Sequence, residues 1–259
     1  MHEFEKSIIR AQWSAPQNIK ALCTTRLAAG HSDKPYDHFN LATHVGDEPG
    51  SVQANREILS EQLALPAEPV WLDQQHTPNA IQLNRLLEFS CPPIADASWT
   101  TESGVVCCVM TADCLPILVT DVDGSCVAAI HAGWKGLANG IVSKTLMQLP
   151  VAPSKLLVWI GPAISQQFFE VGEEVYAAFV EKSADNGQCF FKLDGDNNQD
   201  EIKYMADLPR LAEQELLSLG VGAEAISQSG LCSFGDKRFY SYRQHGRTGR
   251  MASLIWLEN

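Results

Sequence analysis

Positive charge is scarce in this sequence, where 19 lysines and arginines stand against 31 aspartates and glutamates, a formal net charge of −12. Nucleic acids and anionic membrane surfaces attract clustered Lys and Arg. The charge balance therefore argues against either as a partner. Long apolar runs are also missing, since none approaches the roughly 18 residues that a transmembrane helix requires. We expect no nucleic-acid partner and no membrane span.

A secretion signal and a cysteine framework are absent as well. The opening stretch, MHEFEKSIIR, carries charge throughout and contains no apolar core of the kind found in signal peptides. The eight cysteines form no CxxC pair and follow no regular spacing. In a chain without a leader such cysteines are expected to stay reduced. We therefore expect a cytoplasmic protein.

Internal repeats, low-complexity tracts and clean linkers are missing too, so we expect one domain over residues 1–259. Apolar runs predict strands over residues 19–25, 70–72, 104–110, 117–120, 125–130 and 156–160, and a final strand pair over 239–243 and 251–257. Helical spacing predicts helices over 131–149, 173–182 and 208–219, and another from an N-capping Ser51 to Leu65. Because strands and helices mix without a strict βαβ alternation, we predict an α+β fold with mixed sheets.

The stretch TADCLPILVTDVDGSCVAAIHAGWKGLANG, from Thr111 to Gly140, holds the clearest chemical signal. It reads as a hairpin around the tight turn DVDG, followed by a helix. A four-residue turn places Cys114 opposite His131, and a two-residue turn displaces it by one diagonal step. Both registers put the two side chains on one face of the sheet. Such a pair suits a shared metal or a thiol–imidazole hydrogen bond, although buried structural roles are equally open.

A third candidate, His76, lies in the loop DQQHTPN. Two histidines and one thiolate leave a fourth zinc position open for water, which is typical of a catalytic zinc site. The pattern alone does not select this histidine, because His31, His38 and His44 occupy another long loop on equal terms.

Two basic features suggest anion binding. Free N–H groups and Lys135 in HAGWKG could bind an anion, although the spacing is not that of a nucleotide P-loop and an ordinary helix start explains it better. The C-terminal part of this acidic chain also carries a basic run with interleaved aromatic residues. One or two of its arginines could hold a phosphate or carboxylate, the alternative being solvated side chains on an edge hairpin. The run comprises Lys237, Arg238, Arg243, Arg247 and Arg250.

Taken together, TADCLPILVTD, HAGWKGLANGI, GPAISQQFFEVGEEV and FYSYRQHGRTGR resemble the YfiH or laccase-domain family, once called multicopper polyphenol oxidases. NLATHVGDEP, NREIL and WLDQQH match its N-terminal half, so the resemblance covers essentially the whole chain. It implies a CNF/YfiH-like fold with four α/β/β/α layers and mixed sheets. It also implies a purine nucleoside phosphorylase that acts on adenosine, inosine and methylthioadenosine, with an associated zinc-dependent adenosine deaminase activity.

The resemblance selects His76, Cys114 and His131 as ligands of a zinc ion, with copper as the other candidate metal, and Cys114 and His131 as the catalytic residues. The protein would bind a nucleoside and phosphate and would be a monomer or a homodimer. Gln244 departs from the family pattern, which usually has a second arginine after Arg243. Four residues in family-like motifs are predicted to bind substrate: Arg26, Asn40, Arg56 and Arg243. One of the three arginines would position phosphate.

Three other functions stay open at the level of sequence. Cys114 and His131 could be the nucleophile and base of a hydrolase that acts on an amide in cell-wall precursors, as in peptidoglycan editing. A Cys/His site also binds copper more tightly than zinc, which allows a copper-dependent polyphenol oxidase. A metal-binding module without enzymatic activity is the remaining possibility, and it predicts no turnover of any nucleoside.

Overall fold

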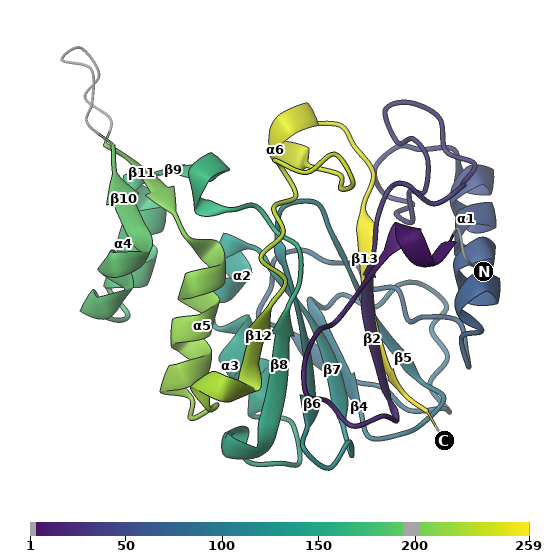
Figure 1. Cartoon of the computed structure of the whole chain (residues 1–259), viewed down its shortest axis with the longest axis horizontal. Helices are drawn as coiled ribbons and strands as arrows, with labels where there is room; N and C mark the ends of the chain where they lie inside the picture. The colour runs from purple at the N-terminus through teal and green to yellow at the C-terminus, as the bar shows by residue number, and fades with distance from the viewer. Residues whose placement is uncertain (1–3, 194–201, 259) are drawn as a thin grey trace.

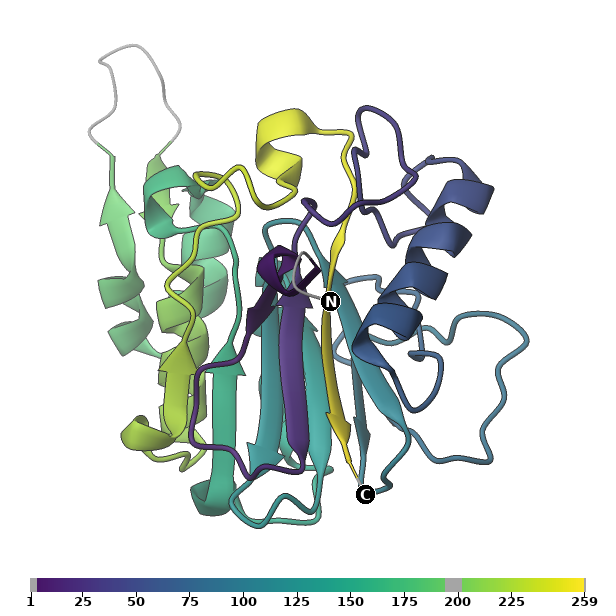
Figure 2. The same cartoon turned by 45° about the vertical axis from the view of Figure 1, so that its right-hand side comes forward.

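The computed structural model describes residues 4–193 and 202–258. Within these ranges two large β-sheets pack against each other, and helices cover the outer face of each sheet (Figures 1 and 2). This α/β/β/α arrangement confirms the predicted α+β fold with mixed sheets.

The first sheet joins the two ends of the chain. Its strand order is β1-β2-β13-β5, and every neighbouring pair is antiparallel. The last strand of the chain thus lies between two strands from its first half. The bounds are β1 (Ile8–Arg10), β2 (Ile19–Thr24), β13 (Met251–Leu257) and β5 (Val106–Thr111).

The second sheet carries the site. Its order is β12-β8-β6-β7-β4-β3, with parallel pairs at both edges (β12 with β8, β3 with β4) and antiparallel pairs between them. Its strands are β12 (Ile226–Gln228), β8 (Leu156–Ile160), β6 (Leu115–Asp121), β7 (Val127–Ala132), β4 (Ala97–Thr100) and β3 (Ala80–Gln82). A small antiparallel sheet contains β10 (Phe190–Lys192), β11 (Lys203–Ala206) and β9 (Glu170–Gly172).

Strand alternation explains the layers. Along β6, Leu118 belongs to the apolar core shared by the two sheets, whereas Ile117 and Val119 belong to the core under the helices on the other face. Successive side chains of a strand point to opposite faces, so a strand buried on both sides is apolar throughout. The covering helices are α2 (Trp134–Ala138), α3 (Ile141–Leu146), α4 (Glu173–Val180) and α5 (Leu208–Ser218) on this sheet, and α1 (Pro49–Leu63) on the first sheet.

Several predicted elements differ from the observed ones, most of them by one or two residues at an end. The helix predicted from Ser51 begins at Pro49 instead, because proline suits the first turn, where its missing N–H leaves no bond unmade. The single helix predicted over residues 131–149 is divided into α2 and α3 by Gly140, whose φ of 80° is left-handed. Residues 70–72 form an isolated bridge between Val70 and Cys107 instead of a strand.

The predicted final strand pair is wrong. Tyr242–His245 form a short helix, α6, whose N-cap Ser241 accepts a hydrogen bond from the backbone N–H of Gln244. Met251–Leu257 do form a strand, β13, but its partners are β2 and β5. Figure 1 shows α6 above the upper ends of the strands, where it lies close to the candidate site. None of the helices in the described residues is long and apolar enough to cross a membrane.

Candidate metal centre

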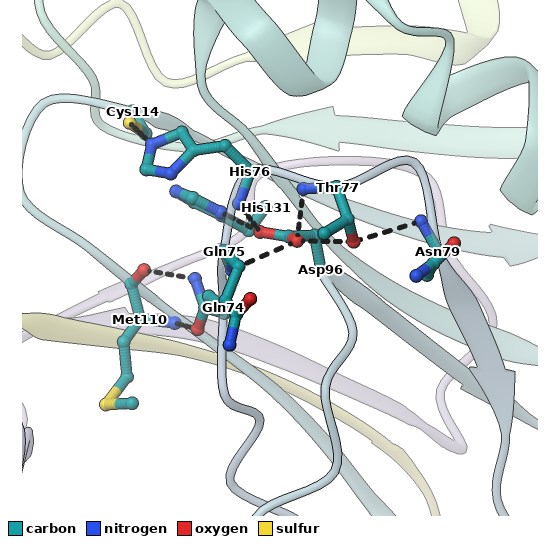
Figure 3. Close-up of polar contacts among 9 residues, drawn as sticks. All are labelled: Gln74, Gln75, His76, Thr77, Asn79, Asp96, Met110, Cys114 and His131. Carbon is teal, nitrogen blue, oxygen red and sulfur yellow. Dashed lines mark hydrogen bonds and ion pairs between the residues drawn. The ribbon is translucent and has the colours of Figure 1, made fainter.

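His76, Cys114 and His131 meet where β6 begins and β7 ends, in the middle of the second sheet (Figure 3). His76 lies in the loop before β3, Cys114 directly precedes β6, and His131 lies in β7. One potential ligand atom from each residue lies within 4.8 Å of the other two. The Sγ atom of Cys114 is 3.6 Å from Nε2 of His76. The structure thus brings together the three residues that the family resemblance selected.

The hairpin register decides between the two predicted alignments. Leu115 pairs with Ala132 and Pro116 with His131, which is the register of the two-residue turn. Cys114 is therefore one diagonal step from His131, on the same face of the sheet.

Asp96, just before β4, holds both histidines in place. One carboxylate oxygen lies 2.7 Å from Nδ1 of His131 and accepts a hydrogen bond from the backbone N–H of His76. The other oxygen accepts hydrogen bonds from the backbone N–H groups of Gln75 and Thr77 and from the Thr77 hydroxyl. Because Nδ1 of His131 faces this carboxylate, Nε2 is the ring nitrogen left to bind a metal.

The backbone at the ligands is specialised. His76 has a φ of 59° and Asp113, which precedes Cys114, has a φ of 90°, both in the left-handed region that non-glycine residues rarely adopt. A Cβ at Gly133 would lie 2.8 Å from Nε2 of His76 and 3.0 Å from Sγ of Cys114. A side chain at residue 133 would therefore displace His76 or Cys114 from its observed position.

The side chains of Cys114 and His131 favour each other's charged forms. Burial by itself raises the pKa of the Cys114 thiol, but the charge of His131 and hydrogen bonds from His131 and His76 outweigh it and lower the pKa to about 6. Burial likewise opposes charge on His131, yet the Cys114 charge and a hydrogen bond to Asp96 raise its pKa to about 9. The thiol is thus poised as a thiolate, the form that binds metals.

The donor set fits a metal ion. Bonds of about 2.3 Å to sulfur and 2.0–2.1 Å to nitrogen at a tetrahedral angle separate two ligand atoms by about 3.5 Å. The distance of 3.6 Å between Sγ of Cys114 and Nε2 of His76 agrees with this value. A metal would displace a proton from His131, since imidazole binds metals in its neutral form.

An aromatic cavity of about 290 Å³ opens on His76 and Cys114. Its walls include Trp134 at the start of α2, Phe169 before β9, and Tyr242 of α6. Lys135 and Arg243 add positive charge. Flat aromatic walls with a few polar groups are typical of small-molecule sites.

Arg243 is the predicted substrate-binding residue that lines this cavity. Its Nη1 donates to the carbonyl of Glu170 and its guanidinium lies 5.2 Å from the ring centroid of Phe169. The buried carboxylate of Asp113 fixes this part of α6, because it accepts hydrogen bonds from the Ser241 hydroxyl and the Arg243 backbone N–H.

Arg26, Asn40 and Arg56 are not among the residues that line the cavities at the triad. Arg26 pairs with Asp37, and Arg56 donates twice to the carbonyl of Leu41. The buried amide of Asn40 bonds to the carbonyl of Ala42 and the carboxylate of Asp47. Their observed contacts hold the loop before α1, and their contact with substrate stays a prediction.

Sequence reasoning missed several residues of the site. Asp96 was not singled out, although a carboxylate directly before a buried strand was a usable signal. The aromatic walls came from three separate segments, so no local pattern linked them. His44 was a rival ligand, and the structure places it outside the triad, in a second cavity that also reaches Cys114 and His131.

The chain has clear relatives among known proteins. Residues 20–258 match the family described as multi-copper polyphenol oxidoreductase laccase. A Pseudomonas aeruginosa protein named purine nucleoside phosphorylase is 44% identical over 250 residues, which cover 95% of this chain and 97% of the relative. Purine nucleoside phosphorylase YfiH of Escherichia coli K12 is 42% identical over 96% of this chain and 98% of its own length.

Solved structures give the same fold. A Neisseria meningitidis protein aligns with a TM-score of 0.88 and 41% identity, over 98% of this chain and 100% of the other. YlmD from Geobacillus stearothermophilus aligns with a TM-score of 0.83 and 26% identity, over 96% and 99% of the two chains. Since its sequence and its fold both match over nearly their full length, the chain belongs to the multi-copper polyphenol oxidoreductase laccase family, to which the YfiH proteins belong.

Proposed function

We propose that this chain is a metal-dependent purine nucleoside phosphorylase whose metal ligands are His76, Cys114 and His131. The observation that carries the proposal is that this triad opens on an aromatic cavity whose walls suit a flat heterocyclic base. Relatives that are 44% and 42% identical bear the name purine nucleoside phosphorylase, which supports the same reaction class.

The proposed reaction moves a ribosyl group from a purine to phosphate. A phosphate oxygen forms a bond to C1′ of the ribose while the bond from C1′ to N9 of the base breaks. The electron pair of the broken bond goes to the base, and the base leaves with the proton that the hydrogen phosphate loses. Adenosine, inosine and methylthioadenosine are the proposed substrates, with conversion of adenosine and water into inosine and ammonia as an associated activity.

The protein side chains would orient the nucleoside. Trp134, Phe169 and Tyr242 offer faces on which a purine can stack, at about 1–3 kcal/mol for a base–aromatic contact. Lys135 and Arg243 place positive charge at the same cavity, where it can attract electron-rich atoms of the base or ribose. A zinc ion held by the triad would supply a Lewis acid beside this cavity.

Asp96 would act through the ligands. Its hydrogen bonds fix the ring of His131 and the backbone around His76, which would hold the two histidine ligands in place around the metal. Preorganised ligands and charges of this kind are a large source of catalytic rate.

A product assay on adenosine tests the proposal. With phosphate present, the expected products are adenine and ribose 1-phosphate, together with inosine from the associated deamination. Without phosphate, inosine should be the product. Cys114→Ala should lose both the bound metal and ribose 1-phosphate formation. If the purified metal-containing protein forms no ribose 1-phosphate in the presence of phosphate, the proposal is wrong.

A further inference from the structure

A second cavity, of about 440 Å³, also reaches the triad. It shares His76, Ala112, Cys114 and Tyr242 with the aromatic cavity and also contacts His131. Four of the five remaining lining residues carry polar side chains, and Met110 is the exception. These residues are His44, Gln74, Met110, Thr111 and Arg250.

Arg250 gives this cavity an unpaired positive charge. Its Nη1 donates to the carbonyls of Thr248 and Gly249 at 2.9 and 3.0 Å, and its backbone N–H donates to Asn40. Over residues 4–193 and 202–258, no carboxylate forms an ion pair with it, whereas Arg26 and Arg238 each have one. The guanidinium also lies 5.8 Å from the ring centroid of Tyr242, so the backbone and this ring hold it in place without a carboxylate in direct contact.

Arg250 is partly buried, so water has limited access to its charged guanidinium. Burial lowers the pKa of this guanidinium, although arginine stays protonated at neutral pH. A bound anion would offset the loss of hydration. The planar fork of the guanidinium matches a tetrahedral oxyanion with two parallel hydrogen bonds.

Thr111, the last residue of β5, supplies an independent sign of a missing ligand. Its side chain is 1% exposed, and its hydroxyl has no hydrogen-bond partner among the described residues. Buried polar groups in folded proteins nearly always have a partner. The amide of Gln74 is not the missing partner of the Thr111 hydroxyl, because it is already paired with both backbone groups of Met110.

His44 completes the polar wall. Burial, and next the charge of Arg250, lower the pKa of His44 below its ordinary value, so the ring is neutral at physiological pH. A neutral imidazole can donate one hydrogen bond to an oxyanion and accept another from a protonated phosphate oxygen. Arg250, Thr111 and His44 therefore present three kinds of group that suit one phosphate.

We propose that Arg250, Thr111 and His44 form an oxyanion subsite that takes inorganic phosphate next to the triad, while the nucleoside occupies the aromatic cavity. The subsite rests on the proposed phosphorolysis. It supplies the phosphate whose oxygen bonds to C1′ as the bond from C1′ to N9 breaks. Arg243 then serves the nucleoside, since it lies at the aromatic cavity against Phe169.

Steady-state kinetics of three variants test the subsite. Loss of a charged hydrogen bond in Arg250→Met should raise KM for phosphate about 10- to 100-fold. Thr111→Val keeps the shape of the side chain and should raise this KM about fivefold. Both should leave KM for the nucleoside and the metal content unchanged. Arg238→Met is the matched control, because Arg238 pairs with Asp236 and lines neither cavity.

Binding of inorganic phosphate alone, followed by ³¹P NMR line broadening, separates this subsite from the proposed function. If the wild-type protein forms ribose 1-phosphate and Arg250→Met raises KM for phosphate no more than Arg238→Met, the subsite is overturned and the function survives. If no ribose 1-phosphate forms, the function fails. Phosphate binding that disappears in Arg250→Met then still supports the subsite, and equal or absent binding in both proteins overturns it.

Discussion

Asp96 contacts both histidine ligands and so fixes their positions relative to each other. Its carboxylate contacts the ring of His131 and the backbone N–H groups around His76. Asp96→Asn replaces one acceptor oxygen by an NH₂ group, which cannot accept these bonds. Loss of such a carboxylate typically weakens metal binding about 10- to 100-fold. We expect a decrease of this size, measured by competition with a chelator of known affinity.

The matched control is Asp123→Asn. Asp123 lies in the turn between β6 and β7, with a side chain 70% exposed and a weak contact to Lys155. Metal affinity should not change in this variant. Equal metal affinity in Asp96→Asn and the wild type would contradict the positioning role of Asp96.

Gly133 controls how closely His76 and Cys114 approach. A methyl group in Gly133→Ala would collide with both side chains, so the metal content should fall well below that of the wild type. Gly136→Ala is the control, because its nearest neighbours would lie 3.6 Å or more away in ordinary contact. Metal analysis of the two purified variants is the measurement. A full metal content in Gly133→Ala would show that the site tolerates a side chain there.

Cys114 should behave as a thiolate in metal-free protein. With a pKa lowered to about 6, its thiolate fraction rises as the pH increases through this value and is constant above it. Its alkylation rate should therefore be half-maximal near pH 6, instead of near the ordinary thiol value of about 8.5. Peptide-resolved mass spectrometry separates it from the exposed Cys91. Zinc should slow the reaction, and an alkylation midpoint near 8.5 would contradict the charge pairing with His131.

At the scale of single residues, the sequence predicted that Cys114 and His131 lie together but did not predict that Asp96 holds the site in place. The hairpin pattern placed Cys114 and His131 on one face because a strand repeats every two residues. It could not choose His76 from four loop histidines, since loop geometry depends on distant partners. The resemblance made that choice, while the role of Asp96 emerged from contacts with residues 19 to 35 positions away.

The element that joins the two cavities is α6. Ser241 caps this helix and also donates to Asp113, next to Cys114. Ser241→Ala removes both contacts, and loss of an N-cap costs about 0.5–2 kcal/mol. Amide hydrogen exchange over residues 242–246 should therefore become faster, with the metal content unchanged.

Ser183→Ala is the control for this variant, because Ser183 precedes a 3₁₀ helix without capping it through its side chain. Exchange over residues 242–246 should match the wild type in Ser183→Ala. Unchanged exchange in Ser241→Ala would mean that other contacts hold α6.

Sequence patterns predicted most helices and strands, but the strand that they predicted over residues 239–243 is wrong. The run from Phe239 to Arg243 alternates like a strand, yet Ser241 and Gly246 bound a short helix instead. The break at Asn139–Gly140 also had a local signal, because glycine favours the left-handed conformation seen there. Apolar periodicity continued across this break and outweighed that signal in the prediction.

At the scale of the whole molecule, the order of the strands was beyond the reach of local patterns. β13 inserts between β2 and β5, more than one hundred residues away from either. Such pairings depend on which apolar faces meet in the folded chain, and many arrangements satisfy the same periodicity. The α+β class followed from the mixture of elements, whereas the four layers were implied by the family resemblance and are confirmed by the structure.

Stepwise metal removal tests most directly whether the triad is the centre of the reaction. Zinc-loaded protein is treated with increasing chelator, and the metal per chain and the rate of ribose 1-phosphate formation are measured at each step. The rate should fall in proportion to the metal and return as zinc is restored to one ion per chain. Full phosphorolysis by metal-free protein would contradict a metal-centred site at His76, Cys114 and His131.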